Sequence, residues 1–486
     1  MAGEWIEYLD RLVWGWPMIA LLMGTHLYMT VRTGGIQRQV FRGIRLSVSR
    51  DQDAAGDVSS FGALTTALSA SVGTGNILGV GTAIALGGPG AVLWMWLSGL
   101  LGMATRYAET LLAVRYRVHG ERGEMLGGAM YVLERGLNMP GAGITFAALG
   151  AAGAFGIGCM VQADAVMEGA RMLASAPEPV MAAGLSLLVG AAVFGGIRSI
   201  ARVTAKLVPG MAAAYLLGCT AILAVNRPFL GPAVRMILRS ALDLRAAGGG
   251  LVGQGAAAAC RYGVARGLFS NESGMGSAPL AAVAARTPNP KVQALVSMTG
   301  TFWDTCVICL LTGLALMTEL ARAPVPETLS GSELAMAAFS RLPCGGRFLS
   351  LALMVFAFTT ILGWYHYGQR CCAYLFGEGC ASWYQALWTA GVFAGALGKT
   401  ETLWSLASVM NGLMAVPNLL SLFLLRREID RETRRFDGDR LMERDGRPIP
   451  GVGVGNKKRW EAFASHRKDS VRDGADGDSA PPPAGA

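Results

Sequence analysis

The sequence predicts an all-α integral membrane protein with about eleven transmembrane helices, two of them interrupted in mid-membrane. The 486 residues are 52% hydrophobic and only 15% charged, which is unusual for a soluble chain of this length. Apolar stretches of about 20 residues, long enough to cross a bilayer, recur along the chain. Glycine, with 66 residues, is abundant, and small residues let membrane helices pack closely or break beside a cavity.

Charge and cysteine content exclude several classes of protein. The net charge of +9 does not indicate nucleic-acid binding, because most Arg and Lys residues lie between apolar segments. The nine cysteines lie mainly inside apolar segments, where free thiols act as small hydrophobic side chains. Cys306 and Cys309 form a C-x-x-C, but no second pair is nearby, so a metal site is not indicated.

The expected spans follow from the apolar runs. They are 12–31, 59–86, 91–114, 144–172, 180–194, 207–225, 251–285, 292–316, 348–375, 383–397 and 403–425. The first is interpreted as a retained helix, because acidic residues precede it and it is longer than the apolar part of a signal peptide. Segments 59–86 and 251–285 stand apart, since both are long, polar in the middle and rich in glycine.

Basic residues follow every odd-numbered span and predict the topology. They are Arg32, Arg38, Arg42, Arg45, Arg50, Arg115, Arg117, Arg122, Arg135, Arg198, Arg202, Lys206, Arg286, Lys291, Arg370, Arg426, Arg427 and Arg431. Basic loops face the cytoplasm, so we expect a multi-pass protein of the cell (inner) membrane with its N-terminus outside and its C-terminus cytoplasmic. Arg227, Arg235 and Arg239 lie on the other side, so the asymmetry is incomplete.

The ten spans after the first divide into two sets of five, and an interrupted segment opens each set. Because five is odd, the second set enters the membrane from the opposite side, which gives an inverted repeat typical of secondary transporters. We therefore expect an N-terminal helix and basic cytoplasmic loop (1–58), a first repeat (59–225), a second repeat (226–425) and a largely disordered cytoplasmic tail (426–486).

In the first interrupted segment, Gly73, Gly75 and Gly79 permit non-helical backbone. Unwinding frees carbonyl groups for a cation and leaves amide groups that favour a carboxylate. The alternative is an unbroken helix packed through its glycines. A dinucleotide-binding loop is excluded, because no strand precedes it and the third glycine is misplaced.

The second interrupted segment carries four consecutive polar residues, 270–273. Such residues are costly at membrane depth unless they face a cavity or a partner. The alternative is a re-entrant turn that serves structure only. For Glu272, a buried structural acid paired with Arg or with backbone amides is favoured over direct ligand contact.

Other polar positions have more than one reading. Thr359 and Thr360 either bond back to the carbonyl one turn earlier or offer oxygen ligands to a cation. Trp364 either lines an apolar pocket or packs against other side chains without a role in binding. Gln162 and Asp164 point to different faces, so at most one reaches a shared cavity. Asp304 needs a partner that the sequence does not identify.

Taken together, the motifs resemble the alanine or glycine:cation symporter family over residues 12–425. The resemblance rests on G-T-G-N-I-x-G-V (73–80), G-G-P-G-A-V-x-W-M-W (87–96), Gly128-x-Met130-Tyr131, Val161-Gln162, G-G-I-R-x-I-A (195–201), Val208-Pro209, Gly363-Trp364 and Tyr367-Gly368. The most specific motif is R-G-L-F-S-N-E-S-G-M-G-S-A-P (266–279).

The resemblance implies a leucine-transporter-like fold, a 5+5 inverted repeat preceded by one extra N-terminal helix. Family members move alanine, glycine or similar small amino acids with sodium, sometimes with protons. The implied substrate-binding residues are Thr74, Gly75, Asn76, Gln162, Phe269, Ser270, Asn271 and Trp364. The implied sodium site lies between carbonyls near Ala70 to Gly73 and the hydroxyls of Thr359 and Thr360.

Four positions depart from the family pattern. The family favours Asn at Cys159 and Asp164, Pro at Ala129 and often Glu at Gln369. If Cys159 or Asp164 lined the pocket, the preferred substrate would differ from alanine.

We expect a sodium-coupled symporter for a small neutral amino acid, with Na⁺ as the coupling ion and no organic cofactor. The expected partners are the amino acid and membrane lipid, without nucleic acid, and a monomer is the simplest oligomeric state. The alternatives are a transporter of the same fold for another solute or coupled to protons, and a channel. An enzyme is not indicated, because the sequence shows no convincing nucleophile–base set.

Overall fold

A computed structural model of the chain describes residues 2–49, 56–121, 123–173, 175–242, 255–287, 289–323, 330–398 and 401–434. Nearly all of these residues are helical, and the one sheet in this part of the chain is the two-stranded antiparallel hairpin of β1 and β2. Most of the predicted tail lies outside the described residues.

The elements before residue 227 include the first interrupted segment. They are α1 (Ala2–Val13), α2 (Trp16–Arg32), η1 (Ile36–Gln39), α3 (Val40–Ser47), α4 (Ser60–Ser71), η2 (Thr74–Asn76), α5 (Leu78–Gly87), α6 (Ala91–Arg115), β1 (Val118–His119), β2 (Met125–Leu126), α7 (Ala129–Tyr131), η3 (Val132–Gly136), α8 (Pro140–Gly153), η4 (Ala154–Met160), α9 (Val161–Leu173), α10 (Glu178–Val193) and α11 (Gly196–Val225).

The remaining elements include the second interrupted segment. They are α12 (Arg227–Leu242), α13 (Ala256–Asn271), α14 (Pro279–Ala282), α15 (Pro290–Thr301), η5 (Phe302–Cys309), α16 (Leu310–Arg322), α17 (Gly331–Phe339), α18 (Gly345–Phe376), η6 (Glu378–Cys380), α19 (Ala381–Leu397), α20 (Glu401–Leu424) and α21 (Arg426–Arg434). The turns η3, η4 and η5 are π-helical, a form often found at functional sites.

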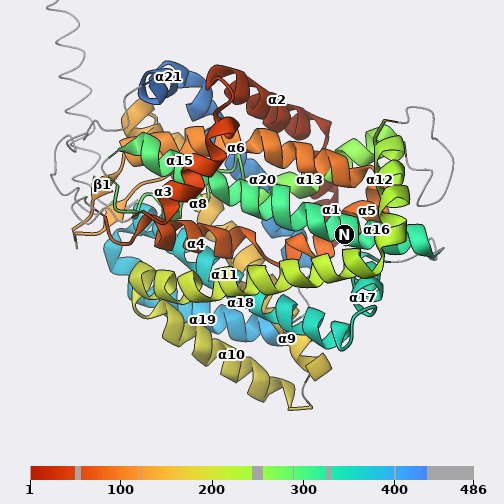
Figure 1. Cartoon of the computed structure of the whole chain (residues 1–486). Coiled ribbons are helices and arrows are strands. Elements are labelled where there is room, and N and C mark those ends of the chain that lie inside the picture. Colours follow the sequence, from red (N-terminus) through yellow and green to blue (C-terminus); the bar gives the residue numbers. More distant parts are fainter. Residues whose placement is uncertain are drawn as a thin grey trace, which may run out of the picture.

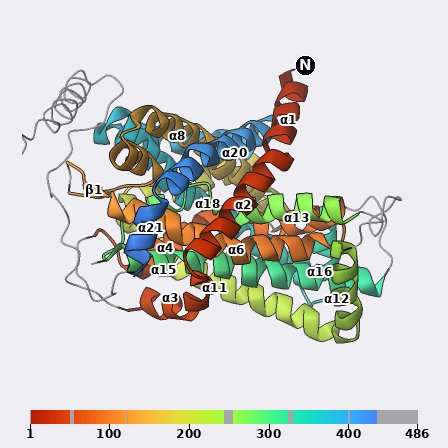
Figure 2. The same ribbon diagram turned by 90° about the horizontal axis from the view of Figure 1, so that it is seen from above.

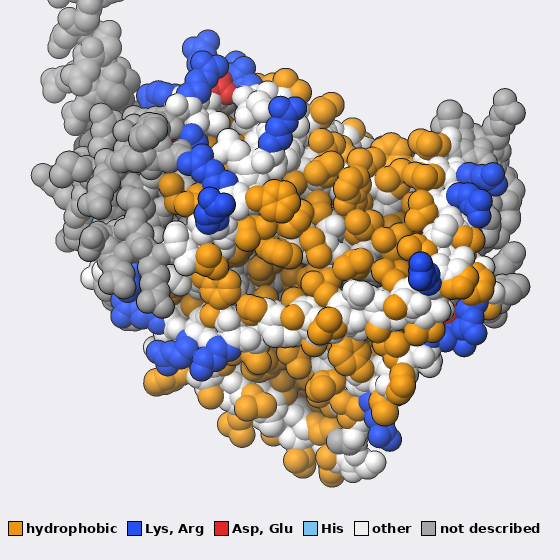
Figure 3. Space-filling view, viewed as in Figure 1, with side chains coloured by type: hydrophobic (Ala, Val, Ile, Leu, Met, Phe, Trp, Pro, Cys, Tyr) orange, Lys and Arg blue, Asp and Glu red, His pale blue; other side chains and the backbone are white. Residues whose placement is uncertain are grey.

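The helices suit a lipid environment. In the described part of the chain, six continuous helical stretches are long and apolar enough to cross a membrane, and α5 and α10 are shorter apolar helices. Figure 3 shows a broad face dominated by hydrophobic side chains, with Lys and Arg toward its margins. These features confirm an all-α membrane protein, whereas the count of eleven spans stays a prediction.

Most long helices, α11, α13 and α16 among them, run roughly along one common axis (Figures 1 and 2). Helix α1 starts at the end of this axis where α12 and α17 lie. The β1–β2 hairpin, α3 and α21 lie at the opposite end. The two ends of the described chain are therefore on opposite sides of the bundle.

Both glycine-rich segments are interrupted, as predicted. In the first, α4 stops at Ser71, Val72 and Gly73 are extended, and the short 3₁₀ turn η2 leads into α5. In the second, α13 ends where Glu272 adopts a left-handed conformation with φ of 55°. The chain then turns through Gly274 and Gly276, both with positive φ, before the four-residue helix α14.

The start of the first interrupted segment is tied to the end of the second by backbone hydrogen bonds. Asp57 and Val58 N–H groups donate to the Ala284 carbonyl, and Arg286 N–H donates to the Val58 carbonyl at 2.8 Å. Arg117 adds side-chain bonds, including one of 2.9 Å to the Ala285 carbonyl. Burial raises the pKa of the Asp57 carboxyl, and a hydrogen bond from the Met125 amide opposes that rise.

Several boundaries differ from the predicted ones. The first span starts with α1 and bends at Gly15, where Pro17 interrupts the helix ladder. Helix α11 starts at Gly196, so Arg198, Arg202 and Lys206 lie on a helix and not in a loop. Helices α12 and α17 were not predicted, because their sequences are too short or too charged to read as spans.

Candidate functional site

A small cavity of about 20 Å³ lies between the two breaks. Its lining residues come from α4, η2, η4, α9, α13, α18 and α20, together with the connections at the breaks. They are Ala70, Ser71, Gly73, Thr74, Gly75, Ile157, Gln162, Phe269, Ser270, Glu272, Thr360, Trp364, Trp404 and Asn411. Elements far apart in sequence thus meet around one partly polar chamber.

Most of the predicted site residues line this cavity. They are Thr74, Gly75, Gln162, Phe269, Ser270 and Trp364 from the substrate set, and Ala70, Gly73 and Thr360 from the sodium set. The other three, Asn76, Asn271 and Thr359, are buried close by without lining it. Their hydrogen bonds, described below, point to positioning roles.

Gln162 is held against the first break. Its Oε1 accepts a hydrogen bond from the Thr74 hydroxyl at 3.5 Å, and its Nε2 donates to the Ile157 carbonyl at 3.2 Å. Ile157 lies in the π-helical turn η4, where the widened helix presents its carbonyl to a side chain five residues later. The local irregularity therefore orients the Gln162 amide toward the cavity.

The region predicted for sodium is built by close contact between α18 and the end of α4. A Cβ added to Gly363 would lie 2.6 Å from the Ala70 nitrogen, and one added to Gly73 would lie 2.7 Å from Thr360 Oγ1. The Thr359 and Thr360 hydroxyls both donate to the Phe356 carbonyl, at 3.0 and 2.9 Å. Each oxygen keeps lone pairs after donating, so bonding back and binding a cation are compatible.

Asp304, whose partner the sequence left open, connects both breaks. Its Oδ1 accepts from Asn76 Nδ2 at 2.7 Å, and its Oδ2 accepts from the Ser270 hydroxyl at 2.9 Å. Thr305 donates a further bond of 2.7 Å. Asn76 in turn accepts from the Gly73 amide at 2.9 Å, so its side chain spans the first break.

The second break is held by buried polar groups. Glu272 Oε2 accepts from the Ser277 hydroxyl at 2.6 Å, and Glu272 also lines the cavity. Asn271 Oδ1 accepts from the Ser273 amide at 2.9 Å, and the Asn271 carbonyl accepts from Arg106 at 3.3 Å. Glu109 accepts from the Gly276 amide at 3.1 Å. These bonds supply partners for backbone that a continuous helix would pair itself.

Five lining residues were not among the predicted site residues: Ser71, Ile157, Glu272, Trp404 and Asn411. Glu272 was expected to be a buried structural acid, and it lines the cavity while it bonds to Ser277. Asn411 could have been predicted from the sequence, because an amide side chain within an apolar helix needs a hydrogen-bond partner or a polar cavity. Its Oδ1 has no hydrogen-bond partner among the described residues. Trp404 could not have been predicted, since a tryptophan in an apolar helix packs against lipid or protein equally well.

The departures from the family pattern lie away from the cavity. Cys159 contacts α19, where its thiol donates to the Trp388 carbonyl at 3.5 Å. Asp164 and Gln369 are partly exposed and are not among the lining residues. Ala129 opens α7, the helix position where proline is most readily accepted. None of the four gives a reason to expect an altered pocket.

Comparison with known proteins supports a transporter. The model of the sodium:alanine symporter family matches residues 1–447. The sodium/alanine symporter AgcS of Methanococcus maripaludis is 43% identical over 447 residues, covering 90% of this chain and 98% of that protein. The putative sodium/proton-dependent alanine carrier YrbD of Bacillus subtilis is 31% identical, covering 96% and 100%. The probable sodium/glutamine symporter GlnT of the same organism is 33% identical, covering 86% and 87%.

Proposed function

Because the chain belongs to the sodium:alanine symporter family, whose members are transporters and not enzymes, we propose that it couples inward sodium movement to the uptake of alanine or glycine. In this proposal the protein lies in the cell membrane with its N-terminus outside. The amino acid binds in the cavity between the two breaks, and alternating access exposes that cavity to either side in turn.

The observation that carries the proposal is the chamber between two interrupted helices. The Gly75 region offers backbone amides at the start of a half-helix, which suit a carboxylate. Carbonyl groups at the end of α13, near Ser270, suit an ammonium group. Carbonyls near Ala70 and Gly73 with the Thr360 hydroxyl provide the oxygen ligands that sodium prefers.

Sodium and substrate sites then share one element. The Ala70–Gly73 stretch borders the proposed sodium site, and Thr74 and Gly75 border the substrate site. Sodium binding orders the break and so completes the substrate site, which makes binding of the two ligands cooperative. One charge crossing 100 mV supplies about 2.3 kcal/mol, enough for roughly 50-fold accumulation before a sodium gradient contributes.

Reconstituted protein tests the proposal directly. Proteoliposomes with an imposed inward sodium gradient are expected to accumulate labelled alanine and glycine. Replacing external sodium by potassium should remove the accumulation, and protein-free liposomes provide the control. Sustained current without coupled amino-acid flux would instead support a channel.

Two relatives suggest rival assignments, glutamine as substrate and protons as coupling ion. Competition of labelled alanine uptake by unlabelled glycine, glutamine and serine ranks the substrates. Apolar pocket walls distinguish amino acids that differ by one methylene group by only about 1–3 kcal/mol in binding free energy, so selection by size will be gradual. Uptake driven by an imposed pH gradient in sodium-free buffer would favour protons.

A further inference from the structure

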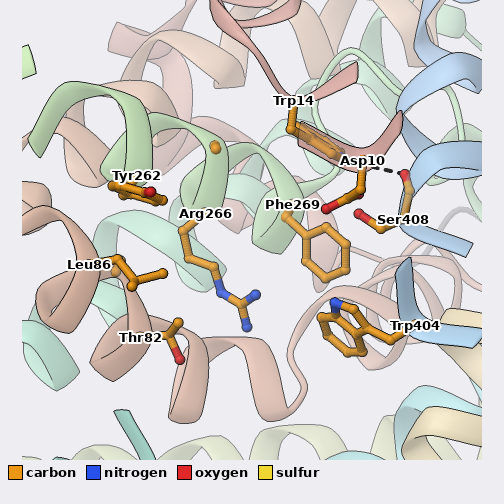
Figure 4. A pocket seen from close by; sticks show the side chains of 11 residues that line it. Asp10, Trp14, Thr82, Leu86, Tyr262, Arg266, Phe269, Trp404 and Ser408 are labelled. Carbon is orange, nitrogen blue, oxygen red and sulfur yellow. Dashed lines mark hydrogen bonds between the residues drawn. The ribbon is translucent and has the colours of Figure 1, made fainter. Parts of the chain in front are cut away.

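A second cavity, of about 180 Å³, adjoins the candidate site beside the end of α1 (Figure 4). Its walls come from α1, α5, α13 and α20. Phe269 and Trp404 line both this cavity and the smaller one, and their ring centroids are 5.6 Å apart. This ring pair therefore forms a partition between the two chambers.

Two opposite charges face this second cavity from different helices. Arg266 projects from α13 with its guanidinium 5.2 Å from the centre of the Phe269 ring, and Asp10 projects from α1. Figure 4 shows the Phe269 ring between the two side chains. Asp10 Oδ1 and Arg266 Nε are buried without a hydrogen-bond partner among the described residues.

The backbone beneath Arg266 is shaped to hold its guanidinium over the first break. A Cβ added to Gly79 would lie 1.8 Å from Arg266 Nε, and one added to Gly75 would lie 3.5 Å from its Nη2. Glycine at 79 thus leaves the space that the guanidinium occupies. Arg266 is fixed above the chamber where the proposed function places the substrate carboxylate.

We propose that this second cavity, the outer station, binds a zwitterionic α-amino acid, with its carboxylate on Arg266 and its ammonium on Asp10. The inference rests on the proposed function. Neither side chain forms an ion pair among the described residues, although Ser408 is a polar partner of the Asp10 carboxylate. Buried charges without an opposite charge beside them are costly, and a zwitterion supplies one compensating charge to each. The ligand side chain lies against Trp14 and Leu86, and Leu86 is 47% exposed at the rim.

The difference in volume predicts a difference in selectivity. The inner chamber has about 20 Å³ of room in this conformation and the outer station about 180 Å³. The outer station therefore accepts side chains that the inner site excludes. A larger neutral amino acid such as leucine binds there, stays above the Phe269–Trp404 partition and slows alanine entry. The α1 helix, which precedes both repeats, gains a role in substrate capture.

Labelled leucine is the probe that separates the two chambers. Equilibrium binding is measured on the full chain in lipid nanodiscs in sodium buffer, and alanine uptake is measured on the same protein in proteoliposomes. Wild type should bind leucine without transporting it. Asp10→Asn and Arg266→Gln should each weaken leucine binding by about tenfold or more, because each removes a charge-assisted hydrogen bond. Arg266→Lys should restore part of the affinity.

Two controls make the result specific. Glu4→Gln removes the same charge from an exposed position of α1 and should leave leucine binding unchanged. Gln162→Met alters the inner chamber and should abolish alanine uptake while leaving leucine binding intact. Unfolding temperatures confirm that each variant is folded.

The outcomes separate this inference from the proposed function. Normal alanine uptake without leucine binding, or equal leucine affinity in Asp10→Asn and Glu4→Gln, would overturn the outer station and leave the symporter intact. Loss of leucine binding in folded Gln162→Met would place leucine in the inner chamber and would also overturn it. Leucine binding that depends on Asp10, in a protein that takes up no alanine, would support the station and reject the symporter.

Discussion

The Asn76 side-chain amide donates a hydrogen bond of 2.7 Å to Oδ1 of Asp304 and so joins the first interrupted segment to the π-helical turn η5. The other oxygen of the same carboxylate accepts from Ser270, at the end of α13. Asp304 is completely buried and does not line the cavity. One side chain outside the chamber therefore fixes the spacing of the two breaks that form it.

Replacing Asp304 by leucine is expected to lower the unfolding temperature and abolish alanine uptake. The substitution leaves Asn76 Nδ2 with only the backbone carbonyl of residue 304 and the Cys309 sulfur, each at 3.3 Å, and leaves the Ser270 hydroxyl with the Cys309 sulfur at 3.5 Å. Losing the strong carboxylate acceptor should cost about 1–3 kcal/mol for each donor. Asp304→Asn keeps one acceptor oxygen and the shape of the side chain, so it should retain more stability and more uptake. Thermal unfolding in detergent and uptake in proteoliposomes check both variants. Wild-type behaviour of Asp304→Leu would show that the network does not position the breaks.

Thr360→Val is expected to raise the sodium concentration needed for half-maximal uptake, because it removes an oxygen that lies against Gly73 at the cavity. Thr359→Val is the matched comparison, since this hydroxyl lies outside the cavity and 3.6 Å from the Met211 sulfur. Its effect should be smaller. The double replacement Thr359→Val with Thr360→Ala should show the largest shift, and an unchanged sodium dependence in the double variant would refute the sodium site.

Gly363→Ala should impair sodium-dependent uptake and cost about 1–3 kcal/mol in stability. The added methyl group would lie 2.6 Å from the Ala70 nitrogen and 2.7 Å from the Ser69 hydroxyl, so α18 would have to move away from the first break. Gly184→Ala, on α10, is the control, because an added Cβ there meets nothing within 4 Å. Equal stability and equal uptake of the two variants would contradict the close packing.

Asn271→Leu should abolish amino-acid binding, but through the shape of the second break. The Asn271 Oδ1 atom accepts from the Ser273 amide, and leucine cannot replace that bond. We therefore expect the unfolding temperature to fall together with binding, while Asn271→Asp, which keeps the acceptor, should preserve more of both. Lost binding at an unchanged unfolding temperature would point instead to direct contact with the substrate.

The positions of both breaks could be predicted from composition. Gly73, Gly75 and Gly79 with neighbouring polar residues cannot form an ordinary lipid-facing helix, and the same holds for residues 270–273. The family followed from the same motifs and is confirmed by the match over residues 1–447. The residue types alone therefore located where the chain departs from regular helix.

The direction in which each buried side chain points could not be predicted. Asn76 and Asn271 were expected in the substrate site, and this stays a prediction: the Asn76 amide and Asn271 Oδ1 make hydrogen bonds within the breaks, whereas Asn271 Nδ2 is buried without a partner among the described residues. Those bonds depend on Asp304 and on the turn at Glu272, whose geometry is set by tertiary packing. The contributions of Trp404 and Asn411 depend on how α20 packs beside η4, and the π-helical turns leave no pattern in the sequence.

The pairing of Val58 with Ala285 has a consequence for leakage of ions. Its backbone bonds join residues 57–58 to residues 284–286, and Arg117, just after α6, donates to carbonyls of residues 283–287, so three parts of the chain meet there. Separating residues 57–58 from residues 284–286 therefore requires several hydrogen bonds to break, which sets an energy barrier. In the proposed transport cycle these bonds would keep this end of the protein closed while the other end is open, and so would prevent sodium from crossing without the amino acid.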